Sequence, residues 1–257
     1  MNEEIYPERI DPLNEGISEG ITIAELTKKS HLKRYKLAKR LVSGKILDAG
    51  SGCGYGSNII AQSPIVESVT GVEKSKDAVE YSIKRYSNDK VEFIEGDCEI
   101  LADMFPENMF DNVVSFEVIE HLKNPDRFLY GVHKILKEGK SLLISTPMKK
   151  HSKCDGYGKP SNIHHIQEFS NDEMLQMLNE SGFKIKSIYS QEIMIAPIIE
   201  MLKSIKGISD ENRRIKNSYK RLWNRIPQTS SFLSHPYRCP EFIRKTARYS
   251  IYLAQKR

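Results

Sequence analysis

Short apolar segments of strand length alternate with amphipathic segments of helix length along most of this chain. In residues 27–42, apolar side chains recur every three positions between Lys and Arg, which predicts an amphipathic helix. Strands are expected at 45–49, 66–72, 91–95, 110–116, 141–146, 183–191 and 249–254, with helices from about residue 55, around 78–83, at 125–136 and at 172–179. Strands that alternate with helices predict an α/β fold, with a parallel sheet and helices on both faces.

One segment interrupts this alternation, because residues 192–247 are far longer than an ordinary connection between strands. An apolar stretch at 193–205 and a basic stretch at 212–225 predict a helical insertion that acts as a lid or as a partner surface. The chain then divides into an N-terminal arm and helix (1–44), a core (45–191 plus 248–257) and the insertion (192–247).

The most informative motif follows the first expected strand, where Asp48 precedes Gly50, Gly52 and Gly54 at every second position. Glycine has no Cβ and tolerates positive φ, so such a turn lets backbone N–H groups approach a ligand closely. The spacing is neither that of a dinucleotide-binding turn nor that of a phosphate loop. Acidic residues also end the next two strands, as Glu73 and Asp97. Because the carboxyl ends of parallel strands meet at one edge, these groups should converge there.

This motif resembles motif I of the class I S-adenosylmethionine-dependent methyltransferases. The resemblance implies a seven-stranded, mostly parallel Rossmann-like sheet with an antiparallel last strand, and S-adenosylmethionine as cofactor. It implies that Glu73 holds the ribose hydroxyls and Asp97 the adenine amino group, although both could simply cap the following helices. Arg34 and Tyr35 could hold the cofactor's carboxylate or could belong to an ordinary helix face. The expected cofactor contacts are Arg34, Tyr35, Asp48, Gly50, Ser51, Gly52, Gly54, Glu73, Asp97, Cys98 and Phe116.

A second group of polar residues follows the strand at 110–116. If Glu117, Glu120 and His121 occupy one helical turn, the i, i+3 and i+4 spacing places them on one face. Two carboxylates and an imidazole suit a divalent cation such as Mg²⁺ or Mn²⁺, and His165 could supply a fourth ligand. His121 and His165 are also candidates to accept a proton during catalysis. Alternatively, the segment shapes an acceptor pocket without metal, and His164 and His165 bond to backbone.

Two narrower resemblances concern the acceptor. The segment Glu117-x-x-Glu120-His121, with His165-x-x-Glu168-Phe169, resembles the metal-dependent methyltransferases of the 3′-terminal 2′-hydroxyl of small RNAs. The segments at 8–9, 31–35 and 162–169 resemble methyltransferases of bacterial and viral glycan assembly. We therefore expect O-methylation of a sugar, glycan or other small-molecule hydroxyl, metal-assisted in one version, with RNA 2′-O-methylation as the alternative. A non-enzymatic module with a retained fold is a third interpretation, against which the intact motif argues.

Charge and cysteine content refine the expected partners and location. The net charge is +5, yet residues 192–257 hold fourteen Lys and Arg against five acidic residues. This basic end suggests a phosphate-bearing acceptor, or merely a solvated helical face. RNA is less expected, since no separate RNA-binding module fits in this length. Four widely spaced cysteines, an acidic start and no membrane-length apolar run predict a reduced, cytoplasmic protein without a membrane span.

Overall fold

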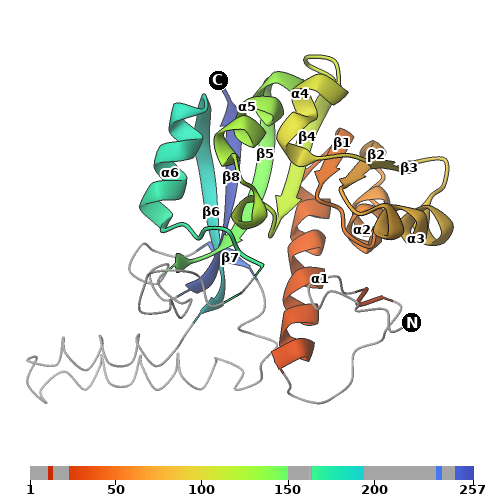
Figure 1. Ribbon diagram of the computed structural model, residues 1–257, viewed down its shortest axis with the longest axis horizontal. Coiled ribbons are helices and arrows are strands. Elements are labelled where there is room, and N and C mark those ends of the chain that lie inside the picture. The colour runs from red at the N-terminus through yellow and green to blue at the C-terminus, as the bar shows by residue number, and fades with distance from the viewer. Residues whose placement is uncertain (1–10, 14–22, 150–161, 163, 194–235, 239–246) are drawn as a thin grey trace, which may run out of the picture.

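One mixed sheet forms the centre of the protein in the computed structural model (Figure 1). The structure describes residues 11–13, 23–149, 162, 164–193, 236–238 and 247–257. In this part of the chain the sheet has eight strands in the order β3-β2-β1-β4-β5-β8-β6-β7. Their bounds are β1 (Gly44–Ala49), β2 (Val66–Glu73), β3 (Val91–Glu95), β4 (Phe110–Phe116), β5 (Leu136–Pro147), β6 (Phe183–Ile193), β7 (Tyr237–Arg238) and β8 (Ala247–Lys256).

Strand direction confirms the expected topology. The first five strands pair in parallel, whereas β8 inserts between β5 and β6 and runs antiparallel to both. The two-residue strand β7, which pairs antiparallel with β6, is an addition that the sequence pattern did not predict. The switch in strand order lies between β1 and β4, and ligands of such sheets bind beyond the carboxyl ends of the strands at this point.

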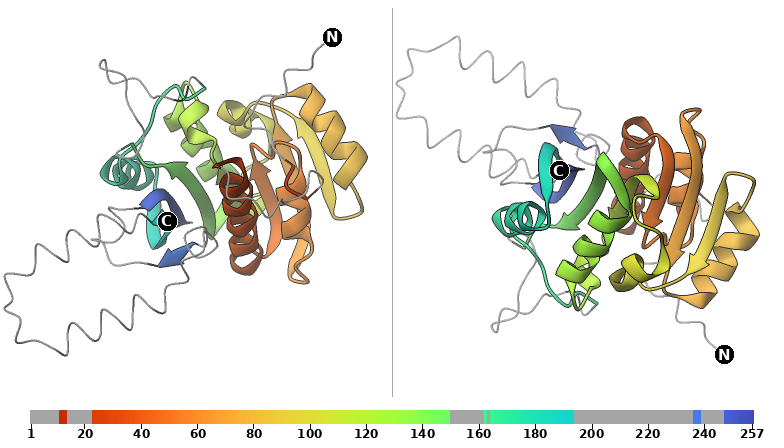
Figure 2. Two further views of the ribbon diagram at one scale, coloured as in Figure 1. Left: turned by 90° about the horizontal axis from the view of Figure 1, so that it is seen from below. Right: turned by 90° about the horizontal axis from the view of Figure 1, so that it is seen from above.

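Helices cover both faces of the sheet (Figure 2). One apolar core lies under α1 (Ile23–Leu41), α2 (Tyr55–Ala61) and α3 (Lys76–Tyr86). The other lies under α4 (Leu101–Met104), α5 (Pro125–Ile135) and α6 (Asn171–Glu180). Because both faces are buried, the central strands are apolar throughout, as in β4, where every residue is buried.

Local sequence signals explain where several elements begin. Ser170 and Glu173 form a reciprocal capping box at the start of α6, and Pro125 occupies the first turn of α5. Residues 137–140, which separate the expected helix at 125–136 from the expected strand at 141–146, lie inside β5 as an irregularity. Phe110 pairs with Leu136 and Asn112 with Ser141, so these four residues bulge out of the ladder, with Gly139 at a φ of 70°.

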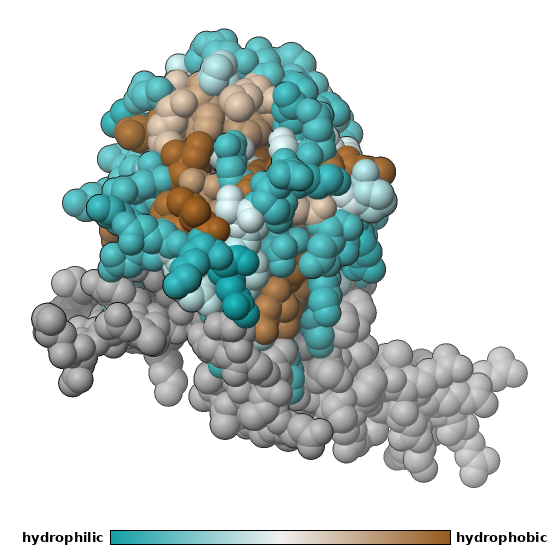
Figure 3. Space-filling view, turned by 90° about the vertical axis from the view of Figure 1, so that its right-hand side faces the viewer, coloured by the Kyte–Doolittle hydropathy of each residue, from teal (hydrophilic) through white to brown (hydrophobic). Residues whose placement is uncertain are grey.

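The helical character predicted for the insertion falls mainly on residues 194–235 and 239–246, outside the described residues, as do Glu8 and Arg9. None of the described helices is long and apolar enough to cross a membrane. On the side of the molecule that carries α3 and β3, apolar side chains lie in several areas among hydrophilic ones (Figure 3).

Candidate active site

The glycine-rich turn connects β1 to α2 at the carboxyl edge of the sheet. The N–H groups of Gly50 and Ser51 donate to the carbonyl of Val72 at 2.8 and 3.0 Å, which ties the turn to β2. Gly50, Gly52 and Gly54 all have positive φ. A Cβ at Gly52 would meet no atom of the described residues within 4 Å, so this backbone faces open space in that part of the structure. The turn therefore leaves room for a ligand beside its backbone.

Asp48 lies below this turn and is completely buried. Its carboxylate accepts hydrogen bonds from the Ser57 hydroxyl at 2.7 Å and from the Tyr35 hydroxyl at 3.2 Å. Burial raises the pKa of Asp48 to about 6, although these two hydrogen bonds oppose the shift. Tyr35, expected to contact the cofactor, is thus bound to Asp48 and packs edge-on against the buried ring of Phe116.

The two acidic residues after β2 and β3 organise the same edge. Glu73 accepts from the N–H of Gly52 at 3.1 Å and from that of Ser75 at 2.9 Å, so it both holds the glycine turn and leads into α3. Asp97 accepts from Lys74 at 2.7 Å and from the N–H of Glu99 at 2.9 Å. Burial by itself would raise the pKa of Asp97, but these hydrogen bonds outweigh burial and lower the pKa. The capping alternative for both residues is therefore compatible with a position beside a ligand.

Two further candidates complete this edge. Cys98 is buried directly after Asp97, and burial, followed by the charges of Glu73 and Asp97, raises the pKa of its thiol. The Ser51 hydroxyl is buried in the turn and has no hydrogen-bond partner among the described residues. The structure thus brings the expected cofactor residues of β1 to β4 together at one edge.

Arg34 makes contacts that the sequence analysis did not predict. It is fully buried on α1, with its Nη1 2.5 Å from Oε1 of Glu117 and 3.1 Å from the Ser145 hydroxyl. Ser145 in turn donates to Glu117 at 2.7 Å, and the guanidinium lies 4.6 Å over the ring of Tyr249. Arg34 therefore neutralises a site carboxylate, a role that the sequence analysis did not consider. Nothing in the sequence marked Ser57 or Ser145 either, since both are ordinary residues within their elements.

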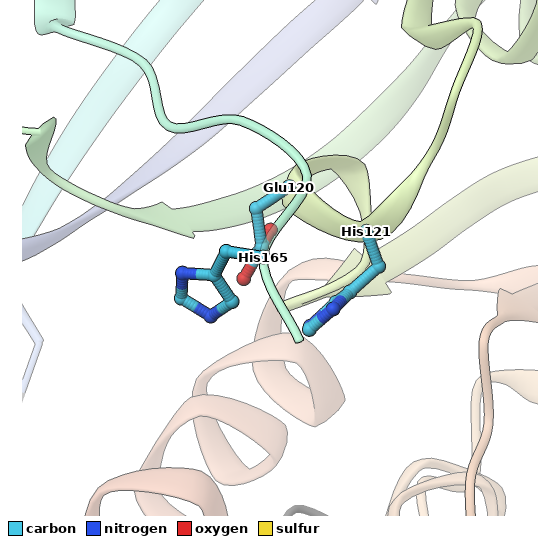
Figure 4. A group of neighbouring side chains, drawn as sticks. All are labelled: Glu120, His121 and His165. Atoms are coloured by element: carbon cyan, nitrogen blue, oxygen red, sulfur yellow. The ribbon is translucent and has the colours of Figure 1, made fainter. Parts of the chain in front are cut away.

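The face expected to carry Glu117, Glu120 and His121 is not formed. Glu117 has a φ of 57°, in the left-handed region, and the following turn is a short 3₁₀-helix (Ile119–His121). A left-handed residue breaks the helical spacing, so Glu117 turns to Arg34. The other two residues instead join His165, and one ligand atom from each lies within 4.8 Å of the others (Figure 4).

Hydrogen bonds fix both histidines of this group. Nδ1 of His121 lies 2.9 Å from the carbonyl oxygen of His164, and Nδ1 of His165 lies 2.8 Å from the buried carboxylate of Glu168. Each Nδ1 must therefore carry the proton, because the partner is an acceptor. In the neutral form this leaves the lone pair on Nε2, and that of His165 accepts from the Asn162 amide at 2.9 Å.

Glu120 is the most unusual member of the group. It is completely buried, and neither carboxylate oxygen has a hydrogen-bond partner in the described part of the chain. Burial, followed by the charge of Glu117, raises the pKa of Glu120 well above its ordinary value. The hydroxyl of Thr146 lies beside the carboxylate. A buried carboxyl group with so little polar contact is costly when it is ionised, and a cation bound here would stabilise its ionised form.

Comparison with known proteins agrees with this geometry. Residues 47–144 match the sequence model of a family described as "Methyltransferase domain". A "probable S-adenosylmethionine-dependent methyltransferase" of Mycobacterium tuberculosis is 33% identical over 149 residues, which are 58% of this chain and 52% of that protein. The chain thus spans about half the length of this curated relative.

Solved structures share the fold at low identity. An S-adenosylmethionine-dependent methyltransferase from Thermotoga maritima, named as a possible histamine N-methyltransferase, has a TM-score of 0.60 at 16% identity, covering 90% of this chain and 92% of that one. The cyclase SpnF has the same TM-score at 18% identity, covering 93% and 85%. Because one neighbour is a cyclase, the fold alone does not determine the reaction.

Residues 47–144 thus match the methyltransferase domain family, and they form a Rossmann-like sheet with a glycine-rich turn at its carboxyl edge.

Proposed function

We propose that the protein is a methyltransferase that binds S-adenosylmethionine at the glycine-rich turn and methylates a hydroxyl of a sugar, glycan or other small molecule. We further propose that a divalent cation, Mg²⁺ or Mn²⁺, binds Glu120, His121 and His165. The observation that carries the second part is the buried, unpartnered carboxylate of Glu120 between two histidines.

The turn fits the cofactor in three respects. Gly52 faces open space, the Ser51 hydroxyl has no partner among the described residues, and Glu73 already contacts the Gly52 backbone. A carboxylate at this position can accept hydrogen bonds from both ribose hydroxyls of a nucleoside. Burial around Asp48 and Phe116 would exclude water from the donor end of the site.

The histidine hydrogen bonds fit a metal. Histidines that bind metals usually donate the other ring N–H to a carboxylate or a carbonyl, as His165 does to Glu168 and His121 to the carbonyl of His164. The Asn162 amide now lies on Nε2 of His165 and would be displaced by a cation. Glu117, the fourth predicted ligand, is bound to Arg34, so we leave it out of the proposed set.

The reaction moves a methyl group from the cofactor's sulfonium to the acceptor oxygen, which must lose its proton. A bound cation would lower the pKa of that hydroxyl. In protein without the cation, Nε2 of His121 or of His165 would be free of metal and would accept the proton instead. The remaining residues hold the two reactants in line, which is the main requirement of such a displacement.

Two titrations test the proposal. Calorimetry with S-adenosylhomocysteine should give micromolar binding that Glu73→Ala weakens strongly, and Mn²⁺ should bind in a way that Glu120→Gln and His165→Ala abolish. Glu180→Gln, an exposed change on α6, serves as the control. Transfer of labelled methyl groups should then stop after chelation. Binding of S-adenosylhomocysteine without any binding of Mn²⁺ would leave a methyltransferase without a metal.

The alternative acceptor is the 2′-hydroxyl of RNA. What favours it is the Glu120–His121–His165 group, whose sequence resembles that of the small-RNA enzymes. Binding to RNA should then weaken steeply as salt increases, because counterions are released from the phosphates. A salt titration of RNA binding would separate this acceptor from a neutral sugar.

A further inference from the structure

A buried carboxylate joins the N-terminal segment to helix α3. Asp11 is only 3% exposed, and its Oδ2 accepts from the Tyr86 hydroxyl at 2.7 Å and from the Tyr81 hydroxyl at 2.8 Å. Its Oδ1 accepts from the N–H of Leu13 at 3.1 Å. Hydrogen bonds to an ionised acceptor are stronger than neutral ones, so this contact fixes Asp11 firmly on α3.

Helix α3 in turn contacts the glycine-rich turn. The hydroxyl of Ser82, between the two tyrosines in sequence, lies 3.1 Å from the carbonyl oxygen of Gly52 and 2.7 Å from that of Ala78, and its one proton is available to both acceptors. A Cβ added at Gly54 would lie 2.8 Å from the same serine, so helix and turn are in close contact. The N–H of Gly52 is held from the other side by Glu73, directly before α3. A shift of α3 would therefore move the Gly52 backbone.

Asp11 also lies near the start of α2. Burial is the main cause that raises the pKa of the Tyr55 hydroxyl, and the charge of Asp11 contributes to the same shift. Tyr55 directly follows the turn, and its hydroxyl lies 3.1 Å from Nδ1 of His31 on α1. The Asp11 carboxylate thus binds α3 directly and acts on the first residue of α2 through its charge.

We propose that Asp11 is a positioning residue for the cofactor, which holds α3 through Tyr81 and Tyr86 and thereby fixes the Gly52 backbone. This inference rests on the proposed binding of S-adenosylmethionine at this turn. A residue that only anchored the N-terminal segment would stabilise the protein equally with and without ligand. A positioning residue must change the affinity for the ligand itself.

The test is S-adenosylhomocysteine binding to the full chain, measured by calorimetry and by the rise in unfolding free energy at saturating ligand. Asp11→Ala should raise the Kd about tenfold, which corresponds to about 1.4 kcal/mol less ligand-induced stabilisation. Asp11→Asn and Tyr86→Phe keep the shape of the side chain, and each should raise the Kd about threefold. Asp103→Ala, in an exposed ion pair, and Tyr130→Phe, on the exposed side of α5, should leave the Kd unchanged.

The two ways of failing can be distinguished. If wild-type protein binds S-adenosylhomocysteine and the Asp11 and Tyr86 variants bind it equally well, the positioning role is overturned while the proposed function stands. If wild-type protein does not bind it, the proposed function is overturned and the inference with it. Should Asp11→Ala fail to fold, Asp11→Asn and Tyr86→Phe decide the question.

Discussion

The guanidinium of Arg34 lies 2.5 Å from the carboxylate of Glu117, so a buried ion pair joins α1 to the end of β4. Glu117 reaches this position only in the left-handed backbone region, at a φ of 57°. A residue other than glycine rarely adopts this conformation, and where it occurs the surrounding structure must enforce it. The contact with Arg34 and the hydrogen bond from Ser145 are the interactions that hold Glu117 there.

Breaking this pair should strongly destabilise the protein. Arg34→Met leaves the Glu117 charge nearly buried without its partner, and we expect a loss of about 3–5 kcal/mol in the free energy of unfolding. The double variant with Glu117→Leu should recover most of it, because no buried charge remains. Urea unfolding measures both, with Lys76→Ala in an exposed pair as control. Strictly additive losses in the double variant would contradict a direct coupling.

Much of the fold could be predicted because hydrophobic periodicity decides it. The bounds of β3 and β4 are those expected from the sequence, and the antiparallel last strand occupies the predicted place. The bulge at 137–140 was not predicted because a polar run with one glycine is typical of a turn as well as of a bulge. Strand β7 has two residues, too few for any periodic signal.

The site was less predictable, since it depends on single backbone torsions and on long-range contacts. The glycine turn was readable because glycines mark unusual backbone by their identity. The left-handed Glu117 carries no such mark, so helical spacing wrongly predicted one helical face for Glu117, Glu120 and His121. The Asp11–Tyr86 contact joins residues 75 positions apart. Nothing in local sequence predicts such a pairing.

A methyl group at Gly52 should abolish cofactor binding while the protein still folds. Its φ of 54° makes alanine strained by about 1–2 kcal/mol, but the alanine Cβ would meet no atom of the described part of the chain within 4 Å. The added group would occupy the space that we assign to the ligand, and we expect Gly52→Ala to raise the Kd for S-adenosylhomocysteine more than tenfold.

Gly139→Ala is a matched control for this variant. Gly139 has a φ of 70°, and among the described residues its Cβ would approach Gln255 alone, at 3.9 Å. It lies in the bulge of β5 rather than in the glycine turn, so Gly139→Ala should cost similar stability without changing the Kd. Equal ligand binding by both variants would argue against a cofactor at the turn.

Asp48 should make the ligand-free protein less stable as pH rises. Its pKa is about 6 when folded against an ordinary value of 3.8, so the folded state binds more protons between these values. Stability therefore falls as pH rises from about 4 to 6, by up to about 3 kcal/mol from this residue. Asp48→Asn should remove the effect. The free energy of unfolding of the variant should therefore rise relative to that of wild type as pH increases across this range. Thermal unfolding of both proteins between pH 4 and 7 checks this prediction. If stability depends on pH in the same way in wild type and in Asp48→Asn, the raised pKa of Asp48 is contradicted.

Two serines on neighbouring strands should be replaceable with a gain in stability. Ser190 on β6 and Ser250 on β8 are paired in register, almost completely buried, and their hydroxyls have no partner within the described residues. A buried hydroxyl without a hydrogen bond costs about 1–3 kcal/mol, so each change to alanine should raise the unfolding free energy by about 1 kcal/mol. Ser57→Ala should have the opposite effect, because Ser57 donates to Asp48. Urea denaturation distinguishes the two outcomes.

Glu168 should tune the proposed metal site without binding the metal. Its buried carboxylate accepts from Nδ1 of His165, which keeps Nε2 unprotonated and orients the ring. Glu168→Gln retains an acceptor but loses the charge, and losing such a partner typically weakens metal affinity about 10–100-fold. Electron paramagnetic resonance of free Mn²⁺ measures the change, with Glu180→Gln as an exposed control. Unchanged Mn²⁺ affinity in Glu168→Gln would mean that His165 is not a ligand, and a Mn²⁺ site that survives His165→Ala would require a different set of residues.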